Sequence, residues 1–482
     1  MKRLPAVVGL ADEIRGKGKN SPEKSADYLL RNRAELRTYP SVDVLAMYSD
    51  PEYAPSTATP GDIKKAKALV HHFTQVRSAI AQALWSREIF IGIDVIDELA
   101  FHGAQDNNVT DLLLECLTRI RDGRMNRPGL IIFPVHSFGV LSAGLFYPLR
   151  RGQLTIVNPD SGYALFPQSN DMGRTFGQLQ RAAERLGVNK SLPRDLLEHW
   201  RLSRGAEWLE RNPLLVVRAN HLPGSYYANE HLLMNRVQSV VGLLSLLAAL
   251  QPATTDRAGF LMSSSRTNNW ETLDIHHYLA LYDPPAHKTE LAGDCVPIHG
   301  GRVEVSEMAA LGFDLDPTYW RRQVALGADM QAQVEKLYIA QLKLKVAGKR
   351  LNAPGRTVNR LFDSLQMFRR SFADSADDWT GRVALSTAFE TLLTDHYGKV
   401  RATLMSRCKE LMRGQRGTRA MQQAVGDLYA SRSELVHGAE QTTSADMYLA
   451  RRAYALCFLA LSKRIDQIPT VTSTPVGDVV DN

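Results

Sequence analysis

Apolar and polar positions divide the chain into a first part that mixes strands with helices and a last part that is helical throughout. Short runs rich in β-branched residues and bounded by Gly, Pro or Asn predict strands over 88–95, 129–134, 153–157 and 214–218. Apolar residues at helical spacing predict helices over 61–85, 110–121, 176–186, 196–210, 229–250 and 271–281. Strands mixed with helices are typical of an α/β or α+β domain.

After Pro317 only the helical period remains. It predicts helices over 319–347, 357–372, 382–395, 403–412, 422–437 and 444–468, and their short connections favour a helical bundle. We therefore expect an α+β protein in four parts. These are a polar N-terminal arm or peripheral layer over 1–60, a mixed α/β domain over 61–317, a helical domain over 318–468 and a disordered tail over 469–482.

Composition supports a protein of two or three domains outside the membrane. The chain has 482 residues, of which 44% are hydrophobic and 23% charged, as in soluble globular proteins. Its longest apolar run, over 240–250, contains Gly242 and Ser245 and is too short to span a bilayer. The first residues lack the apolar core of a signal peptide, and the four cysteines are far apart, which predicts reduced thiols and a cytoplasmic location without membrane partners.

Positive charge is concentrated in two stretches near the C-terminal end. The chain has a formal net charge of +7, and residues 341–370 hold eight basic residues against one acidic residue. Residues 401–420 are also basic, and the two stretches flank the predicted helix over 422–437. This distribution favours a polyanionic partner, although a charge run alone is also typical of a solvated helix face. The residues that we expect to contact RNA there are Lys349, Arg350, Arg356, Arg360, Arg407 and Arg413.

The first part of the chain shows little recognisable chemistry. Phosphate-binding glycine loops are absent, and the metal-competent residues over 276–299 do not follow a recurring zinc spacing. We expect no metal site or cofactor there, and histidines that are satisfied locally on a helix over 271–281. The residues that would have to form a metal site are His276, His277, Cys295 and His299, with His287 and Asp294 nearby. A sensor, a substrate-positioning domain and a scaffold remain open for residues 61–317.

The most informative stretch is 421–438. On a helix, Val425, Leu428, Leu435 and Val436 share one apolar face, and Arg432 lies within it. A guanidinium stays charged, so on an apolar face it needs a carboxylate, a partner chain or a phosphate. His437 falls in the last turn, where a titratable imidazole beside a permanent cation would suit the cleavage of RNA phosphodiesters.

The Arg432-x4-His437 pattern, with its surroundings, resembles the HEPN superfamily. The segments over 384–393 and 406–408, then Leu428-Tyr429, and then 432–438, come in the order of the ApeA-like branch. The resemblance covers roughly the last 130 residues and none of the first 330.

This resemblance implies a metal-independent endoribonuclease that dimerises through its helical bundle. His437 would be the general acid and base, and Arg432 would stabilise the transition state. Tyr429 and Ser433 would support the site, and Glu390 would be the partner of Arg432. The resemblance also implies an effector of bacterial anti-phage defence or abortive infection, restrained by its N-terminal domain until a phage-derived or nucleotide trigger binds.

Two other interpretations stand beside the nuclease. Arg432 and Glu390 would also form an ordinary structural ion pair, and His437 would be favoured by the dipole at a helix C-terminus. The bundle would then be a non-catalytic dimerisation or nucleotide-binding module in a sensor or scaffold protein.

Overall fold

The computed structural model describes most of the residues of the chain. These are 7–16, 21–87, 93–122, 129–134, 155–156, 163–166, 169–203, 206–212, 214–219, 238–252, 277–282, 289–297, 317–347, 353–372, 379–395, 399–436 and 444–465, with Ile89, Ile91, Arg236 and Val480. They fall into two compact units. One comprises 1–129, 219–228 and 342–349, and the other comprises the rest of the chain. The expected α+β class is confirmed, since the chain is mostly helical with one sheet.

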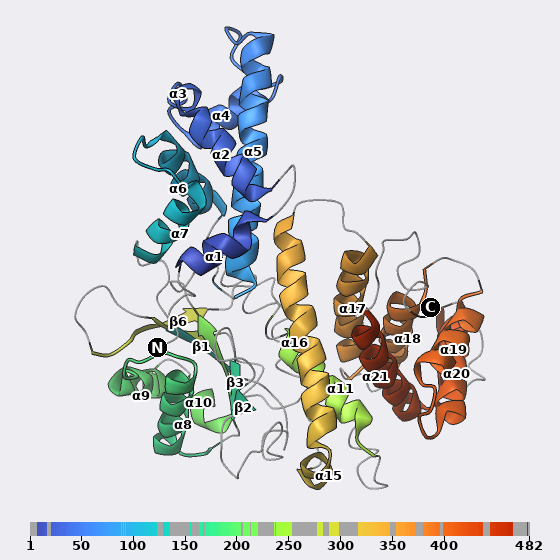
Figure 1. Ribbon diagram of the computed structural model, residues 1–482. Helices are drawn as coiled ribbons and strands as arrows, with labels where there is room; N and C mark the ends of the chain where they lie inside the picture. Colours follow the sequence, from blue (N-terminus) through green and yellow to red (C-terminus); the bar gives the residue numbers. More distant parts are fainter. Residues whose placement is uncertain are drawn as a thin grey trace. The chain divides into compact units, whose positions relative to one another are not determined.

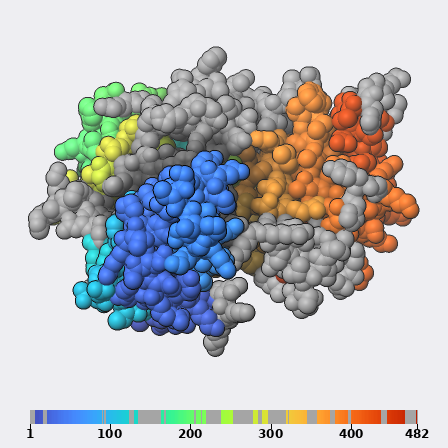
Figure 2. Space-filling view, turned by 90° about the horizontal axis from the view of Figure 1, so that it is seen from above, coloured from blue at the N-terminus to red at the C-terminus, as the bar shows by residue number. Residues whose placement is uncertain are grey.

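The first unit is helical. Its long helix α5 (Pro60–Trp85) begins at a capping box between Thr59 and Asp62, so the predicted helix over 61–85 is confirmed. Helices α2 and α4 pack against α5, and together they form one continuous blue surface in Figure 2 (see also Figure 1). The other helices follow in chain order: α1 (Val7–Arg15), α2 (Pro22–Arg31), α3 (Arg33–Leu36), α4 (Val42–Ser49), α6 (Ile93–Gln105) and α7 (Leu112–Asp122).

Residues before Pro60 are part of the core of this unit. Leu10, Leu29, Leu36 and Leu45 have 1% or less of their surface exposed. The expected polar arm or peripheral layer is therefore built of packed helices. The strand expected over 88–95 is wrong from Ile93 on, because helix α6 begins there and buries Ile96 and Ala100 at helical spacing.

His72 is the residue through which we expect the first unit to respond to acid. Its ring stacks on Tyr28 with 4.0 Å between centroids, and its Nδ1 lies 3.1 Å from Ser25 Oγ. Burial, with a smaller effect of His71, lowers the pKa of His72 below its ordinary value of 6.5. The unfolded chain therefore takes up the proton at a higher pH than the folded chain.

We expect the free energy of unfolding of this unit to hold above about pH 6.5 and to decrease as the pH falls below it. Urea titrations at pH 7.5 and 5.5 measure this, and His72→Gln should remove part of the difference. His102→Gln is the matched control, because His102 is exposed. An equal pH dependence in all three proteins would contradict the assignment.

The second unit contains a sheet in the order β2-β3-β4-β1-β5-β6. The β2–β3, β3–β4, β1–β5 and β5–β6 pairs are antiparallel. Strands predicted over 129–134 and 214–218 are confirmed, and β2 lies within the predicted 153–157. The strands are β1 (Gly129–Pro134), β2 (Thr155–Ile156), β3 (Tyr163–Phe166), β4 (Leu214–Ala219), β5 (His277–Tyr282) and β6 (Ala292–Pro297).

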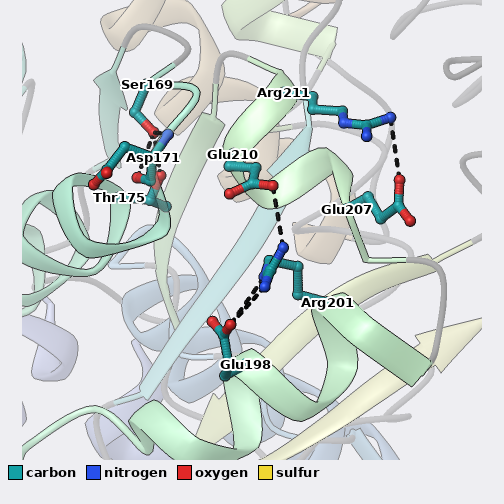
Figure 3. Close-up of polar contacts among 8 residues, drawn as sticks. All are labelled: Ser169, Asp171, Thr175, Glu198, Arg201, Glu207, Glu210 and Arg211. Atoms are coloured by element: carbon teal, nitrogen blue, oxygen red, sulfur yellow. Dashed lines mark hydrogen bonds and ion pairs between the residues drawn. The ribbon is translucent and has the colours of Figure 1, made fainter.

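Helices α8 (Met172–Arg185), α9 (Arg194–Ser203) and α10 (Trp208–Arg211) cover one face of the sheet. All six residues of β1 are buried, so the other face is covered too. Polar contacts cap α8 and connect α9 with α10 (Figure 3). Asp171 caps α8 by accepting a hydrogen bond from the N–H of Arg174, and Arg201 on α9 contacts both Glu198 and Glu210.

The helix predicted over 271–281 is wrong where the structure describes it. Residues 277–282 form β5, which pairs with β1 on one side and β6 on the other, with Leu279 opposite Cys295. A short continuous apolar run fits a buried strand as well as a buried helix, and here two neighbouring strands decide. Within the described part of the chain, His, Cys, Asp and Glu do not gather in groups of three or more that could hold a metal. His276, His287 and His299 lie outside that part.

The remaining helices form a bundle that carries the candidate site. They are α11 (Gln238–Leu250), α15 (Pro317–Arg322), α16 (Val324–Ala347), α17 (Ala353–Arg370), α18 (Trp379–Leu393), α19 (Val400–Leu411), α20 (Thr418–Val436) and α21 (Met447–Arg464). From α17 on they agree with the predicted helices to within four residues at each end, and the predicted helix over 319–347 is broken between α15 and α16. The predicted helix over 229–250 ends with α11 at Leu250, and most of its predicted first nine residues lie outside the described residues. No helix among the described residues is both long enough and apolar enough to cross a bilayer.

Helix α11 belongs to this bundle although it precedes the expected boundary at 317. It packs against α17 and α21, and every residue from Ser239 to Leu250 is buried. Gly242 allows the close approach to α17, because a Cβ there would lie 2.7 Å from Leu365 Cδ2. Tyr448 and Arg452 of α21 donate hydrogen bonds to the carbonyls of Gln251 and Leu250 at 2.7 and 3.0 Å. The packing therefore divides the chain differently from the expected four parts.

A buried arginine connects the sheet with α16. Arg236 has no exposed surface, and its two terminal nitrogens lie 2.6 and 3.0 Å from the carboxylate oxygens of Glu335. Its guanidinium also lies over the Tyr338 ring at 3.8 Å and the Tyr163 ring at 5.0 Å. One cation thus joins β3, α16 and the residues just before α11.

Candidate functional site

The candidate site lies at the C-terminal turns of helix α20. Its buried face runs through Met421, Val425, Leu428 and Ser431. The sequence placed Val436 on that face, but 53% of Val436 is exposed, so this prediction is wrong. The buried face ends at Ser431. Residues 432–435 are half-buried, and Val436 is exposed.

Arg432 lies at the edge of this buried face and faces α18. Its Nη1 is 3.9 Å from Glu390 Oε1, which confirms the predicted pairing of these two residues. The side chains keep 26% and 27% of their surface exposed, so the pair is not sealed beneath apolar packing. A charge-assisted hydrogen bond would be about 2.7–2.9 Å long, so this contact is loose.

The guanidinium of Arg432 is only partly satisfied by its protein neighbours. Its Nε is buried and has no hydrogen-bond acceptor among the residues that the structure describes. Together with the loose contact to Glu390, this leaves donors of a permanent cation for a further acceptor. Such a half-buried arginine is suited to bind an anionic oxygen.

Three polar residues of α18 face α20 at successive helical turns. Arg382, Ser386 and Glu390 are spaced by four residues, which places them on one side of the helix. Arg382 Nη1 donates a hydrogen bond of 3.1 Å to Ser431 Oγ. Ser386 is buried, and its Oγ has no partner in the described part of the chain. The contact between α18 and α20 is therefore polar beside Arg432.

Sequence reasoning identified Glu390 but missed Arg382, Ser386 and Ser431. The repeat of polar residues every four positions along α18 could have indicated that this face meets something other than a purely apolar core.

Tyr429 and Ser433 lie within one turn of Arg432 and are half-buried. They are one turn apart from each other, on the side of α20 next to Arg432. His437 and Gly438 directly follow the last residue of α20 and lie outside the described residues. The meeting of Arg432 with His437 therefore stays a prediction.

Two of the residues expected to contact RNA, Arg360 and Arg407, bind the end of helix α18. Arg360 donates hydrogen bonds to the carbonyls of Thr391 and Thr394, and Arg407 donates one of 2.6 Å to the carbonyl of Leu393. Both arginines also pair with the buried Asp395, at 3.7 Å for Arg360 and 2.8 Å for Arg407. They cap the C-terminal end of α18, where cations are favoured, and so differ from the surface contacts expected of them.

The other basic residues of that set have mixed positions. Arg413 is exposed and pairs with Glu410. Arg356 lies in the first turn of α17, and Lys349 and Arg350 lie outside the described residues. Some of the basic residues near α20 therefore stabilise the fold. The number of basic residues in the sequence is larger than the number that could contact a polyanion.

Replacing Asp395 with asparagine is expected to lower the free energy of unfolding by about 2–4 kcal/mol. The change would leave Arg360 and Arg407 near each other without their shared carboxylate, and losing one partner of a buried ion pair is costly. Urea titration followed by circular dichroism measures the loss.

Asp122→Asn is the matched control for Asp395→Asn. Asp122 pairs with Arg121 on the surface, where solvent screens an exposed pair and it contributes little to stability. Equal losses in the two variants would contradict a structural role for Asp395.

Comparison with protein-family models, with curated proteins and with solved structures finds no match for this chain. The resemblance to the HEPN superfamily therefore rests on the residues quoted above and on their order along the chain.

Proposed function

We propose that this protein is a metal-independent endoribonuclease of HEPN type, with Arg432 and His437 acting on RNA phosphodiester bonds. The observation that carries the proposal is the state of Arg432. Its side chain reaches solvent, contacts Glu390 only loosely and has a buried Nε without an acceptor among the described residues. A permanent cation whose N–H donors are only partly used by its protein neighbours supports the binding of a phosphate oxygen.

The proposed reaction uses the 2′-hydroxyl of the RNA as the nucleophile. His437 takes the proton of the 2′-hydroxyl or returns one to the leaving 5′-oxygen, because an imidazole titrates near neutral pH. Arg432 stabilises the charge that develops on the phosphorus oxygens, and Glu390 lies beside its guanidinium. The products are a 2′,3′-cyclic phosphate and a 5′-hydroxyl.

The wider setting of the proposal comes from the resemblance alone. It comprises a homodimer with both Arg–His pairs at one cleft, a role in anti-phage defence, and restraint by the N-terminal part of the chain. A cleft shared by two protomers would bring four catalytic side chains to one RNA strand.

The test is cleavage of total cellular RNA by the purified full chain in EDTA, with analysis of the product ends. The full chain is needed because α11 belongs to the bundle. Cyclic phosphate and 5′-hydroxyl ends are expected from the wild type and not from His437→Ala. Arg419→Ala is the matched control, since Arg419 is an exposed arginine at the start of α20. Cleavage that survives in His437→Ala would overturn the proposal.

The Arg432–Glu390 pair also favours a second candidate, a non-catalytic dimerisation or nucleotide-binding module. In that case no form of the chain would cleave RNA. The wild type would still form dimers or bind nucleotide, and Glu390→Gln would change only stability.

A further inference from the structure

Helices α19 and α21 bring two cysteines together that are 49 positions apart in the sequence. Cys408 of α19 and Cys457 of α21 are fully buried, and their side chains share a hydrogen bond. This contact and burial both raise the pKa of Cys408 well above its ordinary value, so the resting pair is a dithiol. The other two cysteines, Cys116 and Cys295, are not in disulfides either.

Helix α19 buries fewer residues than its neighbour. Only Leu404, Cys408 and Leu411 of α19 are buried, whereas α21 buries eleven residues. The N-cap residue of α19, Lys399, has a positive φ of 49° and makes no side-chain cap, whereas Arg407 further along the helix pairs with Asp395. Elements with few buried contacts open locally more often than the rest of a fold, so α19 is the element that would expose Cys408.

We propose that Cys408 and Cys457 are an oxidation site that forms a disulfide between α19 and α21 when the protein meets a peroxide. On opening of α19, the Cys408 sulfur attacks one oxygen of hydrogen peroxide. The O–O bond breaks, one water leaves, and Cys408 becomes a sulfenic acid. The Cys457 sulfur then attacks the Cys408 sulfur and displaces the hydroxyl as a second water. In total, two thiols are oxidised and one peroxide is reduced to two waters.

The disulfide would enclose a loop that contains all of α20. This loop runs from Cys408 to Cys457, and α20 spans Thr418–Val436. Closing a loop of this length restricts the unfolded chain, so the oxidised bundle should resist unfolding more than the reduced one. The effect does not depend on the proposed nuclease activity, because no residue of the candidate site takes part.

The test treats the full chain with hydrogen peroxide, removes the excess with catalase and maps disulfides by mass spectrometry of unreduced peptides. We expect one cross-link, between the peptides of Cys408 and Cys457, which dithiothreitol reverses. The midpoint of thermal unfolding should rise by several degrees on oxidation and return on reduction. Cys116 serves as an internal control, because it is equally buried but lies in α7, where five of eleven residues are buried, and it should stay a thiol.

Three variants make the experiment specific. Cys408→Ser should lose the cross-link and Cys295→Ser should keep it. Leu404→Ala, which loosens α19, should speed its formation several-fold without changing which cysteines pair. The proposal is overturned if Cys408 and Cys457 remain thiols after peroxide treatment, or if either of them pairs with another cysteine. If Cys408→Ser does not fold, the map of the wild type still decides.

Discussion

RNA cleavage by the proposed nuclease is expected to fall by a factor of about 10²–10³ when Arg432 is replaced with alanine, the range typical of removing one preorganised donor to a developing negative charge. The loss should appear mainly in kcat, because the contact strengthens as charge accumulates in the transition state. Single-turnover assays on a short RNA of defined sequence, in EDTA, measure this step directly.

The fold of the Arg432→Ala variant should be intact. Its ion pair with Glu390 is long and partly exposed, and pairs of this kind contribute less than about 1 kcal/mol to stability. Arg432→Lys should recover part of the rate, since lysine keeps the charge but not the planar set of donors. A folded Arg432→Ala variant that cleaves RNA at the wild-type rate would show that this arginine does not act in the reaction.

Unfolding is expected to become easier by about 3–5 kcal/mol when Glu335 is replaced with glutamine, because Arg236 would remain buried without its counter-charge. Arg236 has no exposed surface from which it could reach water. The rings of Tyr338 and Tyr163, over which its guanidinium lies, restrict its movement. Chemical denaturation of the full chain, followed by tryptophan fluorescence, measures the change.

A double variant separates the charge from the packing. Arg236→Met with Glu335→Leu removes both charges and keeps apolar volume between the sheet and α16, so its stability should be closer to the wild type than that of Glu335→Gln. The stability lost by the double variant is compared with the summed losses of Arg236→Met alone and Glu335→Leu alone. If the two are equal, the pair stabilises the fold through its geometry and not through charge balance.

Long periodic segments were predictable from the sequence and short apolar runs were not. Helix α5 was identified to within a residue because 26 residues repeat one helical pattern. By contrast, 88–95 and 271–281 are short and dense in apolar residues, and such runs fit either kind of element. For 277–282, hydrogen bonding to β1 and β6 determines the outcome, and those partners lie far away in the sequence.

The candidate site was predictable only where a residue pattern carried information about its partner. Arg432 could be paired with Glu390 because each matched a position in the family pattern. Arg360 and Arg407 look like free positive charge in the sequence, since nothing there shows that they meet the carbonyls ending α18. In the same way, the apolar period of α11 shows that the helix is buried but not that α17 and α21 bury it.

Helix α11 leaves the ribosome long before the helices that cover it. Arg464, at the end of α21, lies about 200 residues after Leu250, which at about 5–20 residues per second is a delay of roughly 10–40 s. During that time an almost entirely apolar helix lacks α21, which is part of the native surface that covers it. We therefore expect an interval during synthesis in which α11 is incompletely covered, and that interval ends only when the last helix has emerged.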